Sequence, residues 1–345
     1  MKKLVIYPFL ILILISCKKN EVTDDIDPIG QEPILNLSSS NPPFTLDLSS
    51  ANFYQDISYD TDVLNVFDFF MPNKNTASSL CIIIHGGGFV GGDKTQPYSS
   101  TYFKSLINNL LSNNIAVASI NYRFIENNET EGLIKCLNDS KRALQFMRYY
   151  SNTLNFNKQK IVLIGSSAGA GTSLWIGFND DLADINNPDP ILRETTRIQG
   201  IVGTSTQSNY DVLEWHNNVF SEYQISGFNL DTVKSIMTET TILKYFGVNS
   251  FSELSSSQIV TYRNNVNMLN LMSNDDPEFY ITTSGIPYTS PNNTSELYHH
   301  PLHVESLKDK ANLTNATGIF YCPELGIDTR NGENIENFIL RKIGE

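Results

Sequence analysis

Residues 80–94 read LCIIIHGGGFVGGDK and place a glycine-rich loop directly after an apolar, strand-like run. So much glycine lets the backbone approach a ligand closely, because no side chain stands in the way. Three kinds of site use such a loop at the end of a strand: a dinucleotide pyrophosphate site, a phosphate-binding P-loop, and an oxyanion hole for acyl transfer. Each requires a different partner elsewhere in the chain, so the remaining sequence discriminates among them.

The residues after the loop disfavour both nucleotide sites. A dinucleotide site needs an acidic residue about 20 residues further on, which binds the ribose hydroxyl. No Asp or Glu occurs between Lys94 and Ile125, and only Arg123 would remain to meet a 2′-phosphate. A P-loop needs Gly directly before its Lys, whereas here Asp93 precedes Lys94 and puts a carboxylate where phosphates would lie. The dinucleotide site is a remote alternative, and the P-loop is excluded.

A second motif favours the oxyanion hole. Residues 160–178 read KIVLIGSSAGAGTSLWIGF, a β-rich stretch that runs into a helix of small residues. Residues 165–169 fit the pattern G-x-S-x-G, in which a sharp strand-to-helix turn projects the Oγ of the central Ser. The helix N-terminus adds a positive dipole end, and the backbone N–H of Ala168 can converge with those of the glycine loop on one oxygen. Ser167 is therefore the candidate nucleophile.

The order of the apolar runs predicts an α/β fold. Strands and helices alternate from residue 79 onward, which is typical of a mostly parallel sheet covered on both faces. Two earlier strand-like runs, joined by Asp60-Thr61-Asp62, should form an antiparallel pair. The stretch 205–275 is too long for a plain connection and is predicted to be an inserted helical cap. The strand-like runs lie at about 52–59, 63–70, 79–85, 115–121, 160–165, 198–204, 278–284 and 317–322, and the helix-like runs at about 99–112, 131–150, 168–178, 300–312 and 333–343.

The N-terminal residues indicate export. Residues 1–16 combine a basic start with an apolar run too short to span a bilayer comfortably, which is typical of a signal peptide. Ser16 before Cys17 resembles the lipobox of bacterial lipoproteins, which implies cleavage before Cys17 and lipid attachment to its sulfur. We therefore expect a lipid-anchored protein of the bacterial cell envelope, on the periplasmic face or at the cell surface. An uncleaved N-terminal anchor is the alternative.

The rest of the chain predicts a tether and one large domain. Residues 17–48 are rich in Asp, Pro, Ser and Asn and should form a flexible tether, with the folded domain at 49–345. The chain of 345 residues is 40% hydrophobic, which suffices for one α/β domain with a full core. Its formal net charge of −13 argues against a nucleic-acid partner, because phosphate binding needs a basic stripe.

From about residue 79 to residue 178 the chain resembles the α/β-hydrolase superfamily, in the branch of the carboxylesterases and hormone-sensitive-lipase-like enzymes. This resemblance implies an eight-stranded, mostly parallel sheet with a cap, Ser167 as nucleophile, and no cofactor. It also implies that backbone N–H groups of Gly87, Gly88 and Ala168 form the oxyanion hole. The matching residues are His85-Gly86-Gly87-Gly88-Phe89, Asn121-Tyr122-Arg123, Asp139 with Arg142-Ala143-Leu144, and Gly165-Ser166-Ser167-Ala168-Gly169. In the family, His85 usually supports the glycine loop, and Asp139 is expected to order neighbouring backbone or to pair with Arg.

The resemblance loosens where the acid and the base should follow. A serine hydrolase needs a base to take the Ser proton and an acid to orient that base, and the family order is Ser, then Asp or Glu, then His. The loop after the seventh strand contains no Asp, and its only carboxylate is Glu296. No His occurs after His303, so the chain has no His after the eighth strand, where the family has its base.

A cluster of histidines at 299, 300 and 303 begins a predicted helix near the carboxyl edge of the sheet. The sequence favours a structural role for these residues. For a displaced base the candidates are His300 and His303, with Glu296 as the candidate acid. One metal ion can bridge His300 and His303, but no second cluster accompanies them, so no metal site is predicted.

Two functions remain open. The first is a serine ester hydrolase of the carboxylesterase type, acting on small acyl or acetyl esters, some of them glycan-derived. The second is a catalytically degenerate α/β-hydrolase-like lipoprotein that binds a ligand at the former active site. Hydrolysis that depends on Ser167 would separate the first from the second.

Overall fold

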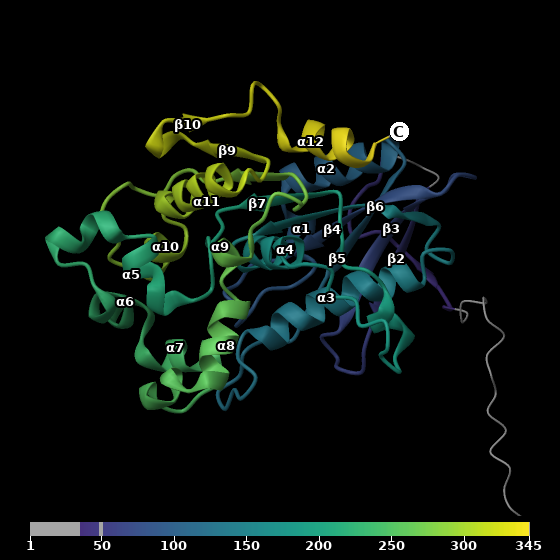
Figure 1. Ribbon diagram of the computed structural model, residues 1–345. Coiled ribbons are helices and arrows are strands. Elements are labelled where there is room, and N and C mark those ends of the chain that lie inside the picture. Colours follow the sequence, from purple (N-terminus) through teal and green to yellow (C-terminus); the bar gives the residue numbers. More distant parts are fainter. Residues whose placement is uncertain (1–34, 48–50, 345) are drawn as a thin grey trace, which may run out of the picture. The chain divides into compact units, whose positions relative to one another are not determined.

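A single sheet carries the fold in the computed structural model, which describes residues 35–47 and 51–344 (Figure 1). Within these residues the sheet has ten strands in the order β1-β2-β3-β5-β4-β6-β7-β8-β9-β10. The six strands from β5 to β9 run parallel, whereas β1, β2, β3 and β10 are antiparallel to their neighbours. The strands are β1 Ser39–Ser40, β2 Ala51–Ser58, β3 Val66–Pro72, β4 Ser78–Ile84, β5 Ile115–Ile120, β6 Phe156–Ser166, β7 Gly200–Thr204, β8 Phe279–Thr282, β9 Gly318–Cys322 and β10 Ile327–Asp328.

This sheet confirms the predicted α/β fold. Each of the eight predicted strands corresponds to one observed strand, and the antiparallel pair at the start is β2 with β3. The sequence did not indicate β1 and β10, which are two-residue strands at the two edges. Strands this short carry no periodicity from which to predict them.

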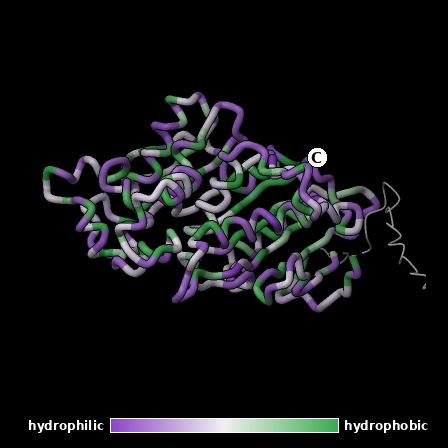
Figure 2. Tube along the Cα trace, turned by 60° about the horizontal axis from the view of Figure 1, so that its bottom comes forward, coloured by the Kyte–Doolittle hydropathy of each residue, from purple (hydrophilic) through white to green (hydrophobic). Residues whose placement is uncertain are grey.

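Helices cover the two faces of the sheet because its central strands are apolar on both sides. All residues of β4 and β5 are buried, which is typical of parallel strands between two helical layers. One core cluster packs α2 (Thr101–Ser112) and α12 (Ile335–Ile343) on the first face. The other packs α3 (Ile134–Tyr149), α4 (Ala168–Phe178) and α11 (Pro301–Thr314) on the second face. In Figure 2 the hydrophobic stretches gather along these inner strands.

The predicted cap is a series of short helices between β7 and β8, at the left of Figure 1. Its buried side chains are mostly apolar and join the core cluster of the second face. The cap therefore shares its core with the second face of the sheet and is not a separate domain. Its α-helices are α5 Trp215–Asn218, α6 Leu230–Met237, α7 Glu239–Phe246, α8 Ser257–Asn265 and α9 Met268–Leu271.

The predicted boundary of the folded domain, at residue 49, is wrong within the described part of the chain. Leu35 and Leu37 pack against the core, and the Phe44 ring lies 5.6 Å from that of Phe70. The backbone N–H of Asp47 donates to Asn108 at 2.9 Å. Apolar residues spaced among Ser, Pro and Asn are thus enough to dock this stretch, although its composition is that of a tether.

The predicted signal peptide and the lipid-attachment residue Cys17 lie outside the described residues. Among the residues that are described, no helix is long and apolar enough to cross a membrane.

A buried ion pair closes the glycine loop onto the sheet. The Nζ of Lys94 lies 2.8 Å from Asp68 on β3 and 2.9 Å from Asp56 on β2. Lys94 is 4% exposed and Asp68 is 1% exposed, so neither charge is well solvated. The backbone N–H of Lys94 also donates to Asn121, just after β5. The lysine that ends the opening motif therefore anchors the loop and does not face a ligand phosphate.

Replacing this lysine tests the anchor. Lys94→Met leaves the buried carboxylate of Asp68 without its partner and should lower the free energy of unfolding by about 3–5 kcal/mol. Urea denaturation followed by circular dichroism measures the change. The matched control is Lys158→Met, whose pair with Glu194 is more exposed and should contribute less than about 1 kcal/mol. Equal stability losses for the two variants would contradict the anchoring role.

Candidate active site

The turn that carries Ser167 lies between β6 and α4. Ser167 has φ 51° and ψ −119°, a backbone conformation that residues other than Gly rarely adopt. Close packing of strand and helix imposes this turn, since a Cβ on Gly169 would lie 2.0 Å from the carbonyl oxygen of Ile84. A Cβ on Gly165 would likewise meet Gly169 at 2.2 Å. The motif glycines are thus required by the fit of α4 against β4 and β6.

The glycine loop stands beside this turn. Gly87 has φ 114°, and a Cβ there would lie 2.0 Å from the carbonyl oxygen of Gly91. The Nδ1 of His85 lies 2.6 Å from the carbonyl oxygen of Gly86, and its ring stacks on Tyr122 at 4.4 Å. Burial lowers the pKa of His85, which favours the neutral ring. This geometry fits the supporting role that the family resemblance implies for His85.

A histidine lies directly against Ser167. The Ser167 Oγ is 2.8 Å from the Nε2 of His299, which follows α10 (Thr294–Tyr298) and precedes α11. Burial lowers the pKa of His299 from its ordinary value of 6.5, so its ring is neutral at neutral pH. A neutral imidazole nitrogen at this distance can accept the hydroxyl proton.

The expected bases, His300 and His303, need correction, because neither ring is directed at Ser167. The Nε2 of His300 lies 2.9 Å from the carbonyl oxygen of Thr289, and its Nδ1 accepts the N–H of Leu302. His300 is therefore the N-cap of α11. The ring of His303 contacts Ser208 through Nδ1 and the carbonyl oxygen of Leu297 through Nε2. Both side chains are fully buried.

The expected acid, Glu296, also lies elsewhere. Its carboxylate accepts the backbone N–H of Asn292 at 3.0 Å, and its own N–H is capped by Asn293. Glu296 thus stabilises the first turn of α10. Throughout the described ranges, no carboxylate oxygen lies within 4.0 Å of a ring nitrogen of His299. The structure therefore brings Ser and His together as a dyad.

Asp139 forms the structural contacts that the sequence predicted for it. Its carboxylate accepts two hydrogen bonds from the Arg123 guanidinium, at 2.7 and 2.8 Å, and one from the Arg123 backbone. The amide of Asn65 donates to it as well. These bonds hold the segment after β5, next to the glycine loop.

A small cavity opens directly at Ser167. Its lining brings Gly88 and Ala168, two of the expected oxyanion-hole residues, to the nucleophile, whereas Gly87 is one position outside it. Ala168 is the first residue of α4, where backbone N–H groups have no partner within the helix. The space left is enough for about one water molecule. The lining residues are Gly88, Phe89, Ser167, Ala168, Gln207, Tyr210, Trp215, Tyr245 and Tyr298.

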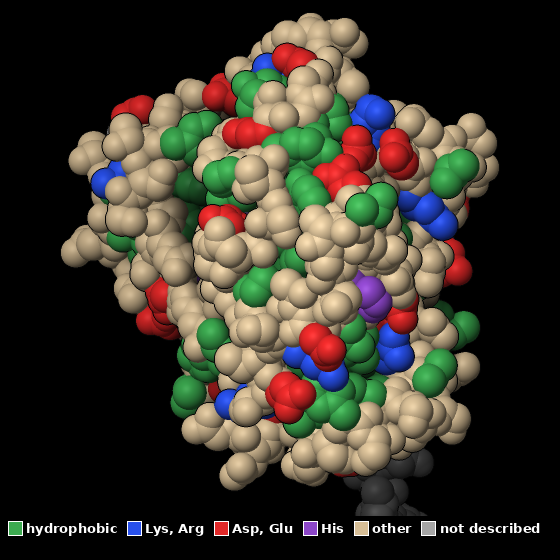
Figure 3. Space-filling view, turned by 90° about the vertical axis from the view of Figure 1, so that its left-hand side faces the viewer, with side chains coloured by type: hydrophobic (Ala, Val, Ile, Leu, Met, Phe, Trp, Pro, Cys, Tyr) green, Lys and Arg blue, Asp and Glu red, His purple; other side chains and the backbone are tan. Residues whose placement is uncertain are grey.

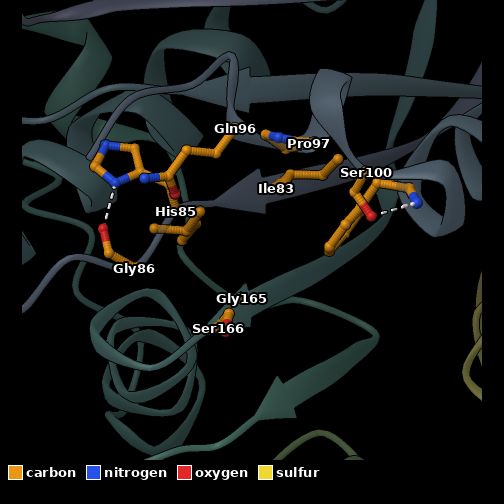
Figure 4. Close-up of a pocket in the computed structure, with 10 residues that line it drawn as sticks. Ile83, His85, Gly86, Gln96, Pro97, Ser100, Gly165 and Ser166 are labelled. Atoms are coloured by element: carbon orange, nitrogen blue, oxygen red, sulfur yellow. Dashed lines mark hydrogen bonds between the residues drawn. The ribbon is translucent and has the colours of Figure 1, made fainter. Parts of the chain in front are cut away.

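A larger cavity of about 220 Å³ lies beside the turn and opens to solvent (Figure 4). It is bordered by Ile83 and Gly86 on one side, Ser166 on another, and Pro97 and Ser100 at the start of α1 (Gln96–Ser99) and α2. Neither Ser167 nor His299 lines it. Of the two, only the smaller cavity adjoins Ser167.

The outer surface over the cap carries mixed charges. Figure 3 views the side that lies at the left of Figure 1, and there acidic side chains alternate with lysines and arginines among uncharged residues.

The sequence signal for the base was ambiguous because His299 and His300 are adjacent. Two successive residues at a helix start point in different directions, and only one of them can face the sheet edge. Gln207, in the loop after β7, carried no signal at all, since a single amide has no motif.

The model of the BD-FAE family matches residues 67–302, which is more than half of the chain. No curated protein matches the chain significantly. The match includes the glycine loop, the nucleophile turn, the cap and His299.

Solved structures share the fold at low identity. A truncated carbohydrate esterase from gut microbiota has TM-score 0.59 and 17% identity, over 86% of this chain and 98% of that chain. Esterase B from Lactobacillus rhamnosis has TM-score 0.55 and 15% identity, over 79% of this chain and 76% of that chain. An acetyl ester-xyloside bifunctional hydrolase from Caldicellulosiruptor lactoaceticus has TM-score 0.51 and 18% identity, over 74% and 77%.

At these identities the solved structures establish the fold alone, and the family match carries the assignment. That match spans the central strands from β3 to β8, the turn at Ser167 and the cap, and we conclude that this chain belongs to the BD-FAE family, within the α/β-hydrolase superfamily.

Proposed function

We propose that this protein is a serine ester hydrolase acting on small acyl or acetyl esters, with Ser167 as nucleophile and His299 as general base. The observation that carries this proposal is the 2.8 Å contact between Ser167 Oγ and His299 Nε2. Two similar structures are described as a carbohydrate esterase and an acetyl ester-xyloside hydrolase, which supports a glycan-derived ester as the substrate.

The first half of the reaction forms an acyl-enzyme. His299 Nε2 takes the hydroxyl proton while Ser167 Oγ attacks the ester carbonyl carbon. The carbonyl oxygen becomes an oxyanion, to which the N–H groups of Gly88 and Ala168 donate, with Gly87 as the third expected donor. The bond to the alcohol then breaks, and the alcohol leaves with the proton that His299 carries.

The second half releases the acid. A water molecule gives a proton to His299 and attacks the acyl carbon, and collapse of the intermediate returns the proton to Ser167 Oγ. The products are one carboxylic acid and one alcohol, and the dyad is restored.

A dyad without a carboxylate should be a slow catalyst. In a well-studied serine protease, loss of the triad acid alone lowers kcat by about 3 × 10⁴, and the oxyanion hole alone leaves about 10³–10⁴ over water. The missing carboxylate also supports a second candidate. This is a degenerate relative that binds an ester or a glycan-derived ligand without turning it over.

The N-terminal segment adds a proposal on location. We propose that lipid attachment at Cys17 holds the domain at the bacterial cell envelope, where glycan-derived esters and other small esters are accessible. The observation is the sequence alone, a signal-like stretch that ends in Ser16-Cys17. Metabolic labelling with a radioactive fatty acid tests it, and labelling that persists in Cys17→Ala would contradict it.

The dyad can be tested with p-nitrophenyl acetate. Ser167→Ala and His299→Ala should each lower kcat by about 10²-fold, because each removes an indispensable part of proton transfer and attack from a dyad that already lacks the acid. A fluorophosphonate should label the wild type and leave Ser167→Ala unlabelled. The control is His216→Gln, a cap histidine on α5, which should keep the wild-type rate. Equal slow rates for all four proteins would favour the ligand-binding candidate.

The pH dependence follows from the base. His299 must be neutral to accept a proton, and burial puts its pKa below 6.5. We expect kcat/KM to be constant near neutral pH and to fall about tenfold per unit once the pH drops through that lowered pKa. A pH–rate profile from about pH 4 to pH 8 measures this, because it covers the range in which the pKa of a buried His falls. An acid limb above 6.5 would mean that another group controls the rate.

Acyl length should matter strongly. The cavity at Ser167 is closed by the aromatic side chains of Tyr210, Trp215 and Tyr245. An octanoyl ester should react at least about tenfold more slowly than an acetyl ester, because forcing methylenes into packed space costs about 1–3 kcal/mol. Comparison of kcat/KM for the two p-nitrophenyl esters measures the ratio. A faster reaction with the octanoyl ester would show that the acyl group binds elsewhere.

A further inference from the structure

The loop after β7 connects the nucleophile to the base. The backbone N–H of Ser167 donates to the carbonyl oxygen of Thr204, the last residue of β7, at 2.9 Å. Ser205 is the first residue after β7, and its backbone N–H donates to the carbonyl oxygen of Thr282, at the end of β8, at 2.8 Å. Residues 205–208 therefore leave the sheet beside the nucleophile turn and next to the strand that leads to His299.

One side chain of this loop holds the residue before the base. The Nε2 of Gln207 donates to the carbonyl oxygen of Tyr298 at 2.8 Å. Gln207 is 4% exposed and lines the cavity that contains Ser167. A buried amide of this kind fixes the peptide unit between Tyr298 and His299, because no water competes for the bond.

A second side chain, that of His303 on α11, holds the carbonyl oxygen of Leu297, the residue before Tyr298. The Nδ1 of His303 accepts the backbone N–H of Ser208 at 3.2 Å, so Nδ1 carries no proton. Nε2–H is then the donor to the carbonyl oxygen of Leu297, at 3.1 Å. Burial lowers the pKa of His303 to about 3, which keeps the ring neutral and in this tautomer over the working pH range.

The cap completes the arrangement. The ring of Trp215 packs on His303 with the ring centroids 4.9 Å apart, and Phe220 packs on it at 5.6 Å. Trp215 also contacts Tyr298 at 5.8 Å. The polar contacts are thus enclosed by aromatic side chains from the cap.

We propose that Gln207 and His303 are positioning residues, which hold two successive carbonyls, those of Leu297 and Tyr298, so that the His299 ring stays on Ser167. This inference rests on the proposed function. The two residues replace what a carboxylate does in a triad, which is to orient the base. They act on the backbone before the histidine, whereas a triad carboxylate binds the second ring nitrogen. A displacement of about 1 Å at a reacting group can cost about 10²-fold in rate, so such fixing has a large effect.

The variant Gln207→Leu in the full chain tests the proposal. It removes the donor with little change in volume, and kcat for p-nitrophenyl acetate should fall by about 10- to 100-fold with KM nearly unchanged. The acid limb of the pH–rate profile should move upward toward 6.5, because a released His299 ring becomes better solvated. A purely structural role for Gln207 would leave this limb in place.

The matched control is Gln145→Leu. Gln145 on α3 is also fully buried, and its amide also donates to backbone carbonyls, those of Leu192 and Glu194. It should lose similar stability and keep both kcat and the pH profile. If Gln207→Leu fails to fold, His303→Gln provides the second variant, with the same expected loss.

Amide hydrogen exchange separates this proposal from the proposed function. Exchange at residues 297–300 should be faster in Gln207→Leu than in wild type and unchanged in Gln145→Leu. A wild type without Ser167-dependent hydrolysis or labelling overturns the proposed function and the catalytic part of this inference, whatever the exchange shows. An active wild type with an unchanged kcat in Gln207→Leu, or with unchanged exchange at 297–300, overturns the positioning role.

Discussion

The close approach of α4 to β4 is the constraint on which the site depends. It requires Gly169, because any side chain there would collide with the carbonyl oxygen of Ile84. It forces Ser167 into its uncommon backbone conformation, at the carboxyl edge of the sheet. The glycine loop leaves β4 at the same edge, so the nucleophile and the oxyanion-hole backbone meet because two elements are packed without a gap.

The proposed base, His299, reaches Ser167 by a different route from that of the family pattern. It comes from the turn between α10 and α11, after β8, where the pattern places the acid. The turn has no carboxylate for the base, but it has a polar contact with the loop after β7 and an aromatic enclosure from the cap. In this chain the cap therefore packs around the residues that precede His299 and also forms part of the wall of the cavity.

Much of the fold could be predicted because it depends on local patterns. The continuous apolar runs of β4 and β5 predict buried parallel strands, and the small residues of α4 predict a tight strand-to-helix turn. The boundary of the domain was less predictable. Residues 35–47 have the composition of a tether. A few of their apolar side chains nevertheless pack against core surfaces that exist only in the folded domain.

By itself the sequence determined the α/β class, the cap, Ser167 and its glycine loop, since each follows from periodicity or from a motif in consecutive residues. The tertiary structure decided which of three neighbouring histidines faces the nucleophile, and it showed His300 and His303 in structural roles. It also decided that Glu296 supports the first turn of α10. The reason is physical: the orientation of a side chain at a turn depends on contacts with loops far away in sequence, and no local pattern encodes those contacts.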